Sequence, residues 1–203
     1  MMRRAMLLLV LLFPGVVTAG PFPADLAEAL IRLSRAHGFS AQFEQTIRFA
    51  DGTMQAYKGD LAVLQPGRFR WRYTAPYEQL FVSDGHVIWH YEPDLMQVEI
   101  MKRVQGVDPA VMRLLDGSLG LGNIALLGKG NEANTGMRRY HVRIGAKTKV
   151  WLGLSGKHLT YVESVDALGN HNRIRLLHVI AHPPAQTEFV FRIPDGVDVL
   201  PLK

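Results

Sequence analysis

The chain has 203 residues, of which 48% are hydrophobic and 20% charged, and it contains no cysteine. This composition is typical of one globular domain with a sizeable core. The lack of cysteine excludes a disulfide scaffold, a thiol enzyme, a cysteine zinc site and a lipid-acylated cysteine anchor. The formal net charge of +5 includes no long run of Lys or Arg, so it predicts no more than a weak attraction to acidic partners or anionic lipid headgroups.

Residues 1–19 have the features of a secretory signal peptide. Arg3 and Arg4 precede an aliphatic stretch over residues 6–13, and Val17 and Ala19 are small residues at positions −3 and −1 of a cleavage site. The stretch is far shorter than the roughly 20 apolar residues that cross a bilayer. We therefore expect residues 20–203 to form a single domain in the periplasm. Without the two arginines its charge is 21 − 18 = +3.

Residues 24–37 are predicted to form an amphipathic helix, which Gly38 would end. Its apolar residues recur at helical spacing: Leu26, Ala29, Leu30 and Leu33. Strands are predicted to follow at 40–49 and 54–64, with a bulge or bend at Gly59. In the first of them, alternation puts Phe43 on the apolar side.

Arginine and aromatic residues alternate without interruption over residues 68–73, RFRWRY. In a strand, Phe69, Trp71 and Tyr73 share one face and the three arginines share the other. The separation disfavours single-stranded nucleic acid, which needs aromatic and basic groups together. Alternation continues to residue 100 across turns at Asp84-Gly85 and Pro93-Asp94, which indicates an antiparallel meander with an unusually aromatic face.

A second short helix is predicted over residues 108–116, because Asp108 can cap it and Pro109 suits its first turn. It is apolar around most of its circumference, so it should be buried on more than one side. From residue 138 onward the chain alternates again in several strands. About ten antiparallel strands with two or three short helices indicate a mainly β protein, a barrel or a strongly curved sheet.

The aromatic face leaves two possibilities open. Either the barrel fills with its own side chains, or the few helices leave an apolar cavity that suits a hydrophobic ligand. Pairs such as His86 and His90 are four residues apart, which on a strand separates the rings by roughly 13 Å and disfavours a metal site. The glycine-rich residues 117–123 lack the features of a phosphate loop. We expect no metal, no cofactor and no enzymatic activity.

Several segments resemble the LolA family of periplasmic lipoprotein carriers. They are FSAQFEQ (39–45), GDL (59–61), PGRFRW (66–71), QLFVSDG (79–85), WHYEP (89–93) and FVFRIPDGVDV (189–199). The resemblance extends from about residue 24 to 200 and is poorest over 117–150. It implies an unclosed antiparallel barrel around an apolar cavity, with short helices as a lid.

The resemblance also implies a function and partners. A monomer would take acylated lipoproteins from the inner-membrane ABC transporter LolCDE and deliver them to the outer-membrane receptor LolB. In this sequence Phe69 matches the family's phenylalanine at the cavity mouth, and Leu33 matches a leucine of the first lid helix. Met112 and Leu115 fall in the second lid helix. Together with the aromatic face, the resemblance leads us to expect acyl contacts at Leu33, Phe43, Phe69, Trp71, Trp89, Met112 and Leu115.

One position departs from the family pattern. Gln65 stands where the family has an arginine that hydrogen-bonds the lid backbone. A glutamine amide donates two hydrogen bonds and carries no charge, so the latch should be weaker or should move, for example to Arg68. The departure keeps open a LolA-like carrier of another lipid. A LolB-like receptor is disfavoured by the missing cysteine, and a lipoprotein-sensing protein would normally need a second domain.

Overall fold

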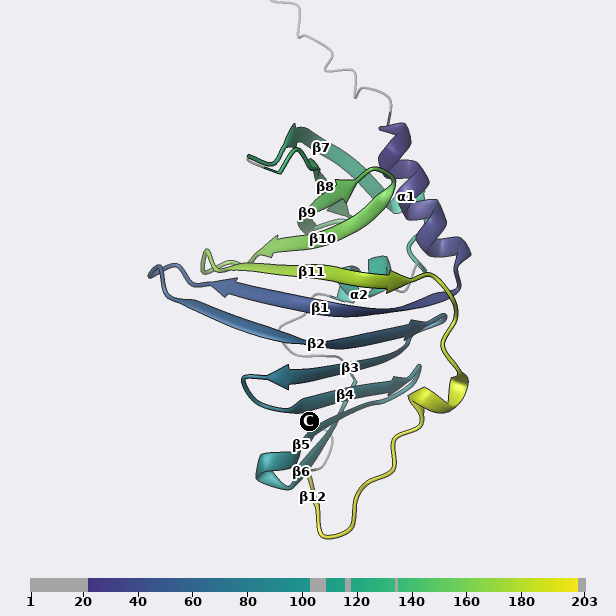
Figure 1. Cartoon of the computed structure of the whole chain (residues 1–203), viewed down its shortest axis with the longest axis vertical. Coiled ribbons are helices and arrows are strands. Elements are labelled where there is room, and N and C mark those ends of the chain that lie inside the picture. Colours follow the sequence, from purple (N-terminus) through teal and green to yellow (C-terminus); the bar gives the residue numbers. More distant parts are fainter. Residues whose placement is uncertain (1–21, 103–108, 116–117, 134, 201–203) are drawn as a thin grey trace, which may run out of the picture.

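The computed structural model describes residues 22–102, 109–115, 118–133 and 135–200. The predicted signal peptide and Asp108 lie outside them. One sheet, antiparallel except for the pair β12–β6, dominates the fold, and its strands lie in the order β12-β6-β5-β4-β3-β2-β1-β11-β10-β9-β8-β7 (Figure 1). The predicted class, a mainly β protein with an unclosed curved sheet and short helices, is confirmed. The estimate of about ten strands was too low, because β7 and β12 were not recognised.

The sheet contains twelve strands in the described part of the chain. They are β1 (Gly38–Arg48), β2 (Met54–Leu64), β3 (Arg68–Ala75), β4 (Gln79–Asp84), β5 (Ile88–Glu92), β6 (Gln97–Met101), β7 (Ile124–Asn131), β8 (Arg138–Ile144), β9 (Thr148–Ser155), β10 (His158–Val165), β11 (His171–Ile180) and β12 (Asp198–Leu200). The helices are α1 (Ala24–Arg35) and α2 (Pro109–Leu115), with 3-10 turns η1 (Pro93–Leu95), η2 (Leu121–Asn123) and η3 (Gln186–Phe189).

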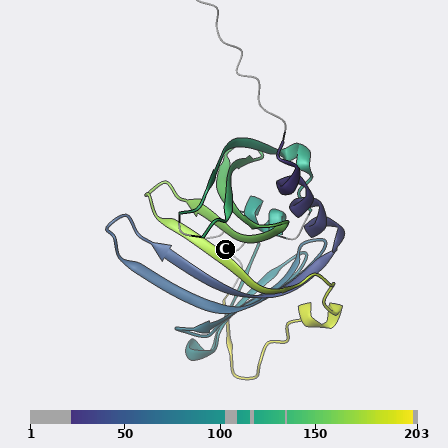
Figure 2. The ribbon, with the colours of Figure 1, turned by 45° about the horizontal axis from the view of Figure 1, so that its top comes forward.

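The sheet curls without closing. Strands β7 to β10 bend over the same side on which α2 lies, and α1 lies beside them (Figures 1 and 2). The two edges, β7 and β12, do not pair with each other. We call the side that faces α2 the inner face and the opposite side the outer face.

Strand register decides which side chains reach the inner face. Phe43 of β1 lies opposite Leu176 of β11, and Val63 of β2 lies opposite Phe69 of β3. Side chains alternate between the two faces along each strand, so the apolar positions of β1–β3 and β8–β11 form one continuous layer. These positions and the apolar stripe of α1 make up the main hydrophobic core. The expected irregularity at Gly59 is confirmed by a register shift between Lys58 and Gly59.

Helix α1 ends slightly earlier than predicted, and at a different residue. His37, with φ 54°, adopts the left-handed conformation that ends the helix, whereas Gly38 already belongs to β1. Glycine is required at position 38 for another reason. A Cβ there would lie 2.5 Å from the carbonyl oxygen of Val63 on the neighbouring strand.

The segment between β11 and β12 crosses the outer face of the sheet. It leaves β11, forms η3 and reaches β12, which pairs in parallel with β6 at the far edge (Figure 1). Phe189 of η3 is 1% exposed and packs against Ala62 and Leu64 of β2. We call residues 181–197 the C-terminal strap, because they bury apolar side chains on the outer face of β2–β5.

Helices long and apolar enough to cross a membrane do not occur among the residues that the structure describes.

Candidate functional site: the apolar inner face

Aromatic rings of β1 and β3 form the centre of the inner face. Phe43 meets Trp71 edge-on with ring centroids 5.2 Å apart, and meets Tyr73 in the same way at 5.1 Å. Phe43, Phe69 and Trp71 are all buried. The structure therefore brings together three of the residues that the resemblance implied. The alternation of residues 68–73 is observed as predicted, with the arginines on the outer face.

A chain of polar side chains borders the aromatic centre. The Tyr73 hydroxyl donates to Gln45 Oε1 at 2.8 Å, and Gln45 Nε2 donates to Asn172 Oδ1 at 3.0 Å. Burial raises the pKa of Tyr73, so this hydroxyl stays protonated and remains a donor. The chain crosses β3, β1 and β11, so it limits the apolar part of the inner face on that side. Sequence alternation could not reveal this chain of hydrogen bonds, because Asn172 is 127 residues away from Gln45.

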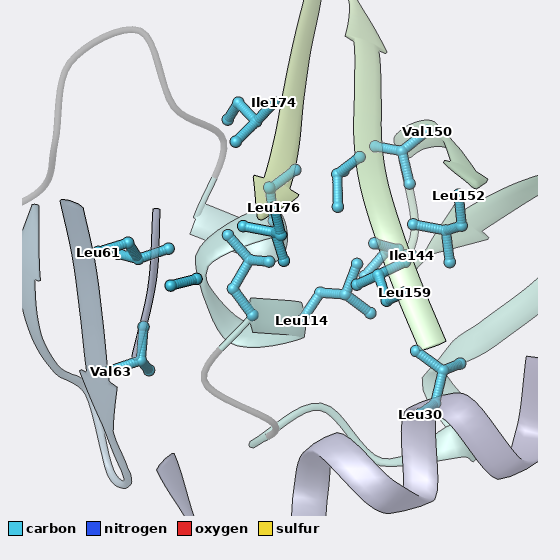
Figure 3. Packing of buried hydrophobic residues seen from close by; sticks show 14 of the residues in the cluster. Leu30, Leu61, Val63, Leu114, Ile144, Val150, Leu152, Leu159, Ile174 and Leu176 are labelled. Carbon is cyan, nitrogen blue, oxygen red and sulfur yellow. The ribbon is translucent and has the colours of Figure 1, made fainter. Parts of the chain in front are cut away.

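Helix α2 fills the concavity of the sheet. Val111, Leu114 and Leu115 are 4%, 2% and 1% exposed. Figure 3 shows Leu114 between Leu61 and Val63 of β2 and the side chains of β8–β11. The prediction that this short helix is buried on more than one side is confirmed. Met112 is only partly buried and packs at the margin of the core. The sequence left two possibilities, a filled core or an apolar cavity on the inner face. In this structure, side chains of α2 occupy that space.

The N-terminal end of helix α1 is fixed by polar contacts with the sheet. Asp25 accepts a hydrogen bond from the Tyr140 hydroxyl at 2.6 Å and pairs with Arg138 at 3.1 Å. One turn later Glu28 pairs with Lys157 at 2.8 Å. Burial and the bond to Asp25 raise the pKa of Tyr140 to about 12. This end of α1 is therefore held to β8 and to the β9–β10 turn.

The C-terminal end of α1 is contacted by Gln65. Gln65 Nε2 donates to the backbone carbonyl of Ser34 at 3.3 Å. The backbone N–H of Gln65 also donates to the carbonyl of His37 at 2.9 Å. The amide thus contacts the backbone of α1 without the charge of an arginine. The role of Gln65 as a latch remains a prediction.

A small cavity of about 70 Å³ lies at this end of α1. Its lining is mostly apolar and includes Leu33, Ala29 and Phe39 together with Leu159 and Leu176 from the sheet. Leu33 itself is only partly buried. The cavity is much smaller than an acyl chain requires, so it marks a place where the packing between α1 and the sheet is incomplete.

Trp89 does not join the inner aromatic residues, and the expectation that it lines the same surface as Phe69 is wrong. In the register of β3–β5, Trp89 lies opposite Val82, which lies opposite Arg70. All three therefore occupy the outer face. Trp89 packs against Phe191 of the C-terminal strap, with ring centroids 6.1 Å apart. Alternation alone could not distinguish the two faces here, because the strap makes the outer face apolar as well.

Polar groups are few in the apolar layer. The indole Nε1 of Trp71 is buried without a hydrogen-bond partner. A buried unpaired N–H costs roughly 1–3 kcal/mol, and a ligand carbonyl could accept from it. A larger groove of about 400 Å³ lies on the outer face, but charged side chains such as Asp60, Arg70 and Arg72 line it. No cluster of three potential metal ligands occurs among the described residues.

Together these features define a class of protein: an open antiparallel sheet whose apolar concave face is closed by two helices. The model of the family "Outer membrane lipoprotein carrier protein LolA" matches residues 34–192 of the chain. The chain therefore belongs to the LolA family.

Relatives in this family match over most of their length. An outer-membrane lipoprotein carrier protein of Bordetella bronchiseptica is 31% identical, with 98% of each chain covered. One from Dechloromonas aromatica is 33% identical over 83% of each chain. Among solved structures, a LolA superfamily protein from Nitrosomonas europaea has a TM-score of 0.50 at 13% identity and covers 82% of this chain and 96% of its own. At that identity the likeness concerns the fold alone.

Proposed function

We propose that this protein is a periplasmic lipoprotein carrier, not an enzyme, which binds the acyl chains of lipoproteins on the inner face of its sheet. Residues 1–19 would direct export, and residues 20–203 would be the working domain. The carrier would receive its cargo from the inner-membrane transporter LolCDE and release it to the receptor LolB. The relatives are named outer-membrane lipoprotein carrier proteins, and these names support lipoproteins as the cargo.

Helix α2 is the observation that carries the proposal. Its side chains Val111, Leu114 and Leu115 are buried against apolar residues of the sheet. An acyl chain offers the same apolar contacts, so it can replace α2 without leaving a buried polar group unpaired. The Trp71 indole N–H, which has no partner in the closed state, would gain an acceptor from an ester carbonyl of the cargo.

The magnitudes suit a carrier that must also release its cargo. Exposing a Val and two Leu side chains costs about 1.5–3 kcal/mol each, and an acyl chain that buries about twelve methylenes gains about 0.8 kcal/mol for each of them. The two totals are comparable, about 5–9 against about 10 kcal/mol. Displacement of α2 therefore offsets much of the gain and keeps the affinity intermediate.

The experiment that tests the function uses the mature protein from Gly20, mixed with membranes that contain the transporter and a tagged triacylated lipoprotein. Native mass spectrometry should detect a membrane-free complex of one carrier and one lipoprotein. Recovery of phospholipid or fatty acid instead would indicate a LolA-like carrier of another lipid. A protein that stays empty with every lipid would contradict the proposal and favour a permanently filled core.

Phe69→Glu tests the site. The buried Phe69 would be replaced by a carboxylate that acyl chains cannot contact favourably, so cargo transfer should be abolished while the fold is kept. Tyr77→Glu is the matched control, because Tyr77 is 69% exposed in the loop between β3 and β4. Phe69→Ala should weaken binding even if the charged variant does not fold. Normal transfer by a folded Phe69→Glu protein would refute the assignment.

A further inference from the structure

The net positive charge of the chain is concentrated in one region of the sequence. Residues 118–162 contain seven Lys or Arg residues and one acidic residue, a net charge of 7 − 1 = +6. The remainder of the chain has 23 − 7 = 16 basic and 18 − 1 = 17 acidic residues. The whole positive excess of the protein therefore belongs to β7–β9 and the connections around them.

Strand register gathers part of this charge on the outer face of β8 and β9. Arg139, His141 and Arg143 of β8 alternate with the inward Tyr140 and Val142, and Lys149 and Trp151 of β9 lie opposite Arg143 and His141. We call the set Arg139, His141, Arg143, Lys149 and Trp151 the basic outer face. Lys147, in the turn between the two strands, is exposed beside it.

Within the described fold these cations form no ion pair, although Arg139 lies near enough to Glu163 to help lower the pKa of that carboxyl. Among the described residues, no carboxylate lies within ion-pair distance of Arg139, Arg143 or Lys149. Glu163, the carboxylate on the neighbouring strand, is occupied by Arg173 at 2.6 Å and by His171 at 3.1 Å. Like charges directly opposite each other in a sheet are destabilising. The pair Arg143–Lys149 therefore costs stability, and the Arg143 guanidinium donates to a neutral group, the Gly145 carbonyl, at 2.9 Å.

Trp151 gives the basic outer face an amphipathic character. The Arg139 guanidinium lies 4.1 Å from the centre of its ring, and the His141 ring stacks on it at 4.5 Å. The indole is half-buried. Burial and the neighbouring Lys149 and Arg139 lower the pKa of His141, so Arg139 is the cation on this ring. A tryptophan beside basic residues is typical of protein surfaces that rest at the headgroup level of a membrane.

We infer that the basic outer face docks the carrier on membrane surfaces that expose anionic phospholipid headgroups. Charge complementarity identifies this partner. The cations lie along two strands and a turn instead of converging on one pocket, and such a diffuse pattern suits a fluid surface of many phosphates. The inner face is on the opposite side of the sheet, so docking leaves the acyl site uncovered. The inference goes beyond cargo binding and applies equally to the empty protein.

Vesicle flotation tests the docking. Wild-type protein should bind vesicles of phosphatidylglycerol and phosphatidylcholine, bind pure phosphatidylcholine vesicles much more weakly, and dissociate when salt is raised, because salt screens exposed charges. Each basic residue near an anionic surface contributes about fivefold in affinity. The double variant Arg143→Gln/Lys149→Gln should therefore lose at least about tenfold, whereas Arg143→Lys, which keeps the charge, should bind as wild type does.

The matched control is Arg48→Gln/Lys58→Gln, which removes two exposed basic residues from the outer face of β1 and β2. It should keep most of the binding. The Arg143 and Lys149 substitutions should not lower the melting temperature, because they remove a like-charge pair. Brominated phosphatidylglycerol should quench wild-type fluorescence, and Trp151→Phe should lose most of this quenching, since Trp71 and Trp89 lie elsewhere.

Two outcomes would overturn the inference. One is equal binding to anionic and neutral vesicles. The other is an equal loss of binding in the Arg48/Lys58 control, which would show that the vesicles respond to the net charge of the protein and not to this face. An acidic protein would then be the better candidate for the partner of the basic outer face. Cargo transfer is measured separately with Phe69→Glu, so failure of docking and failure of the carrier function are distinguishable.

Discussion

Gln65 is the side chain whose amide contacts the backbone at the end of α1. The amide reaches the Ser34 carbonyl at 3.3 Å, a long hydrogen bond between neutral groups. A neutral hydrogen bond contributes about 0.5–1.5 kcal/mol, and one with a charged donor about 1.5–3 kcal/mol. Gln65 is therefore expected to hold the end of α1 more weakly than an arginine would.

The prediction is that Gln65→Ala lowers the free energy of unfolding by about 1 kcal/mol and speeds amide hydrogen exchange in the last turn of α1. Gln65→Arg should slow exchange there and weaken acyl binding, because the helix becomes harder to displace. Hydrogen-exchange mass spectrometry of α1 checks both variants. Unchanged exchange in both would show that Gln65 is not a latch.

Trp89 shows the limit of sequence reasoning at the scale of the residue. Alternation correctly placed Phe69, Trp71 and Tyr73 together, because they belong to one strand. It could not show which face of β5 is the inner one, because both faces of this strand meet apolar partners. The deciding partner, Phe191, is about a hundred residues away in sequence, and no local pattern reports such a contact.

The two helices differ in how they are attached. Helix α1 has hydrogen bonds or ion pairs at both ends. The buried side chains of α2, in contrast, are aliphatic and pack in the apolar core. Opening of α1 must break polar contacts, whereas the buried side chains described for α2 can exchange one apolar neighbour for another. We therefore expect α2 to be the first part of the lid to move.

Leu115→Ala tests this difference. Leu115 is 1% exposed, so truncation should lower the free energy of unfolding by about 2–5 kcal/mol. The same change should tighten acyl binding, because less burial is lost when α2 is displaced. Met112→Ala is the control, since Met112 is only partly buried and should change both quantities less. Denaturant unfolding and a fluorescent fatty-acid titration measure the two effects; a parallel loss of stability and binding would contradict the lid role.

Helix and strand patterns predicted most elements, and the exceptions have physical reasons. Both helices and the meander of β3–β6 were predicted, because periodicity is a local property. Strand β7 was missed because its second half, Gly128, Lys129, Gly130 and Asn131, lacks β-formers. Strand β12 is only three residues long and exists through pairing with β6, which local sequence does not encode.

At the scale of the molecule, the C-terminal strap joins the two halves of the sheet. Phe189 of η3 is buried against Ala62 and Leu64 of β2, and Phe191 packs on Trp89 and Tyr91 of β5. Strands β11 and β6 are thereby connected across the outer face. Phe189 and Phe191 thus have a structural role that is independent of acyl binding.

Phe189→Ala is expected to lower the free energy of unfolding by about 3–5 kcal/mol and to leave acyl affinity nearly unchanged, because the side chain lies on the outer face. Val190→Ala is a suitable control, since Val190 is 62% exposed. Thermal unfolding and lipid titration of both variants check the prediction. A large loss of acyl affinity in a folded Phe189→Ala protein would show that the two faces are coupled.

An unclosed sheet leaves two edge strands at which copies of the protein could associate. Its two edge strands carry backbone N–H and C=O groups that could pair with another copy, a hazard that a closed barrel avoids. Here one edge, β12, is only three residues long. The other, β7, carries a register shift between Leu126 and Gly128 followed by the exposed Lys129. Short length, bulges and lysine at an edge all oppose strand addition. The edges are thus built against aggregation, as suits a carrier expected to work as a monomer.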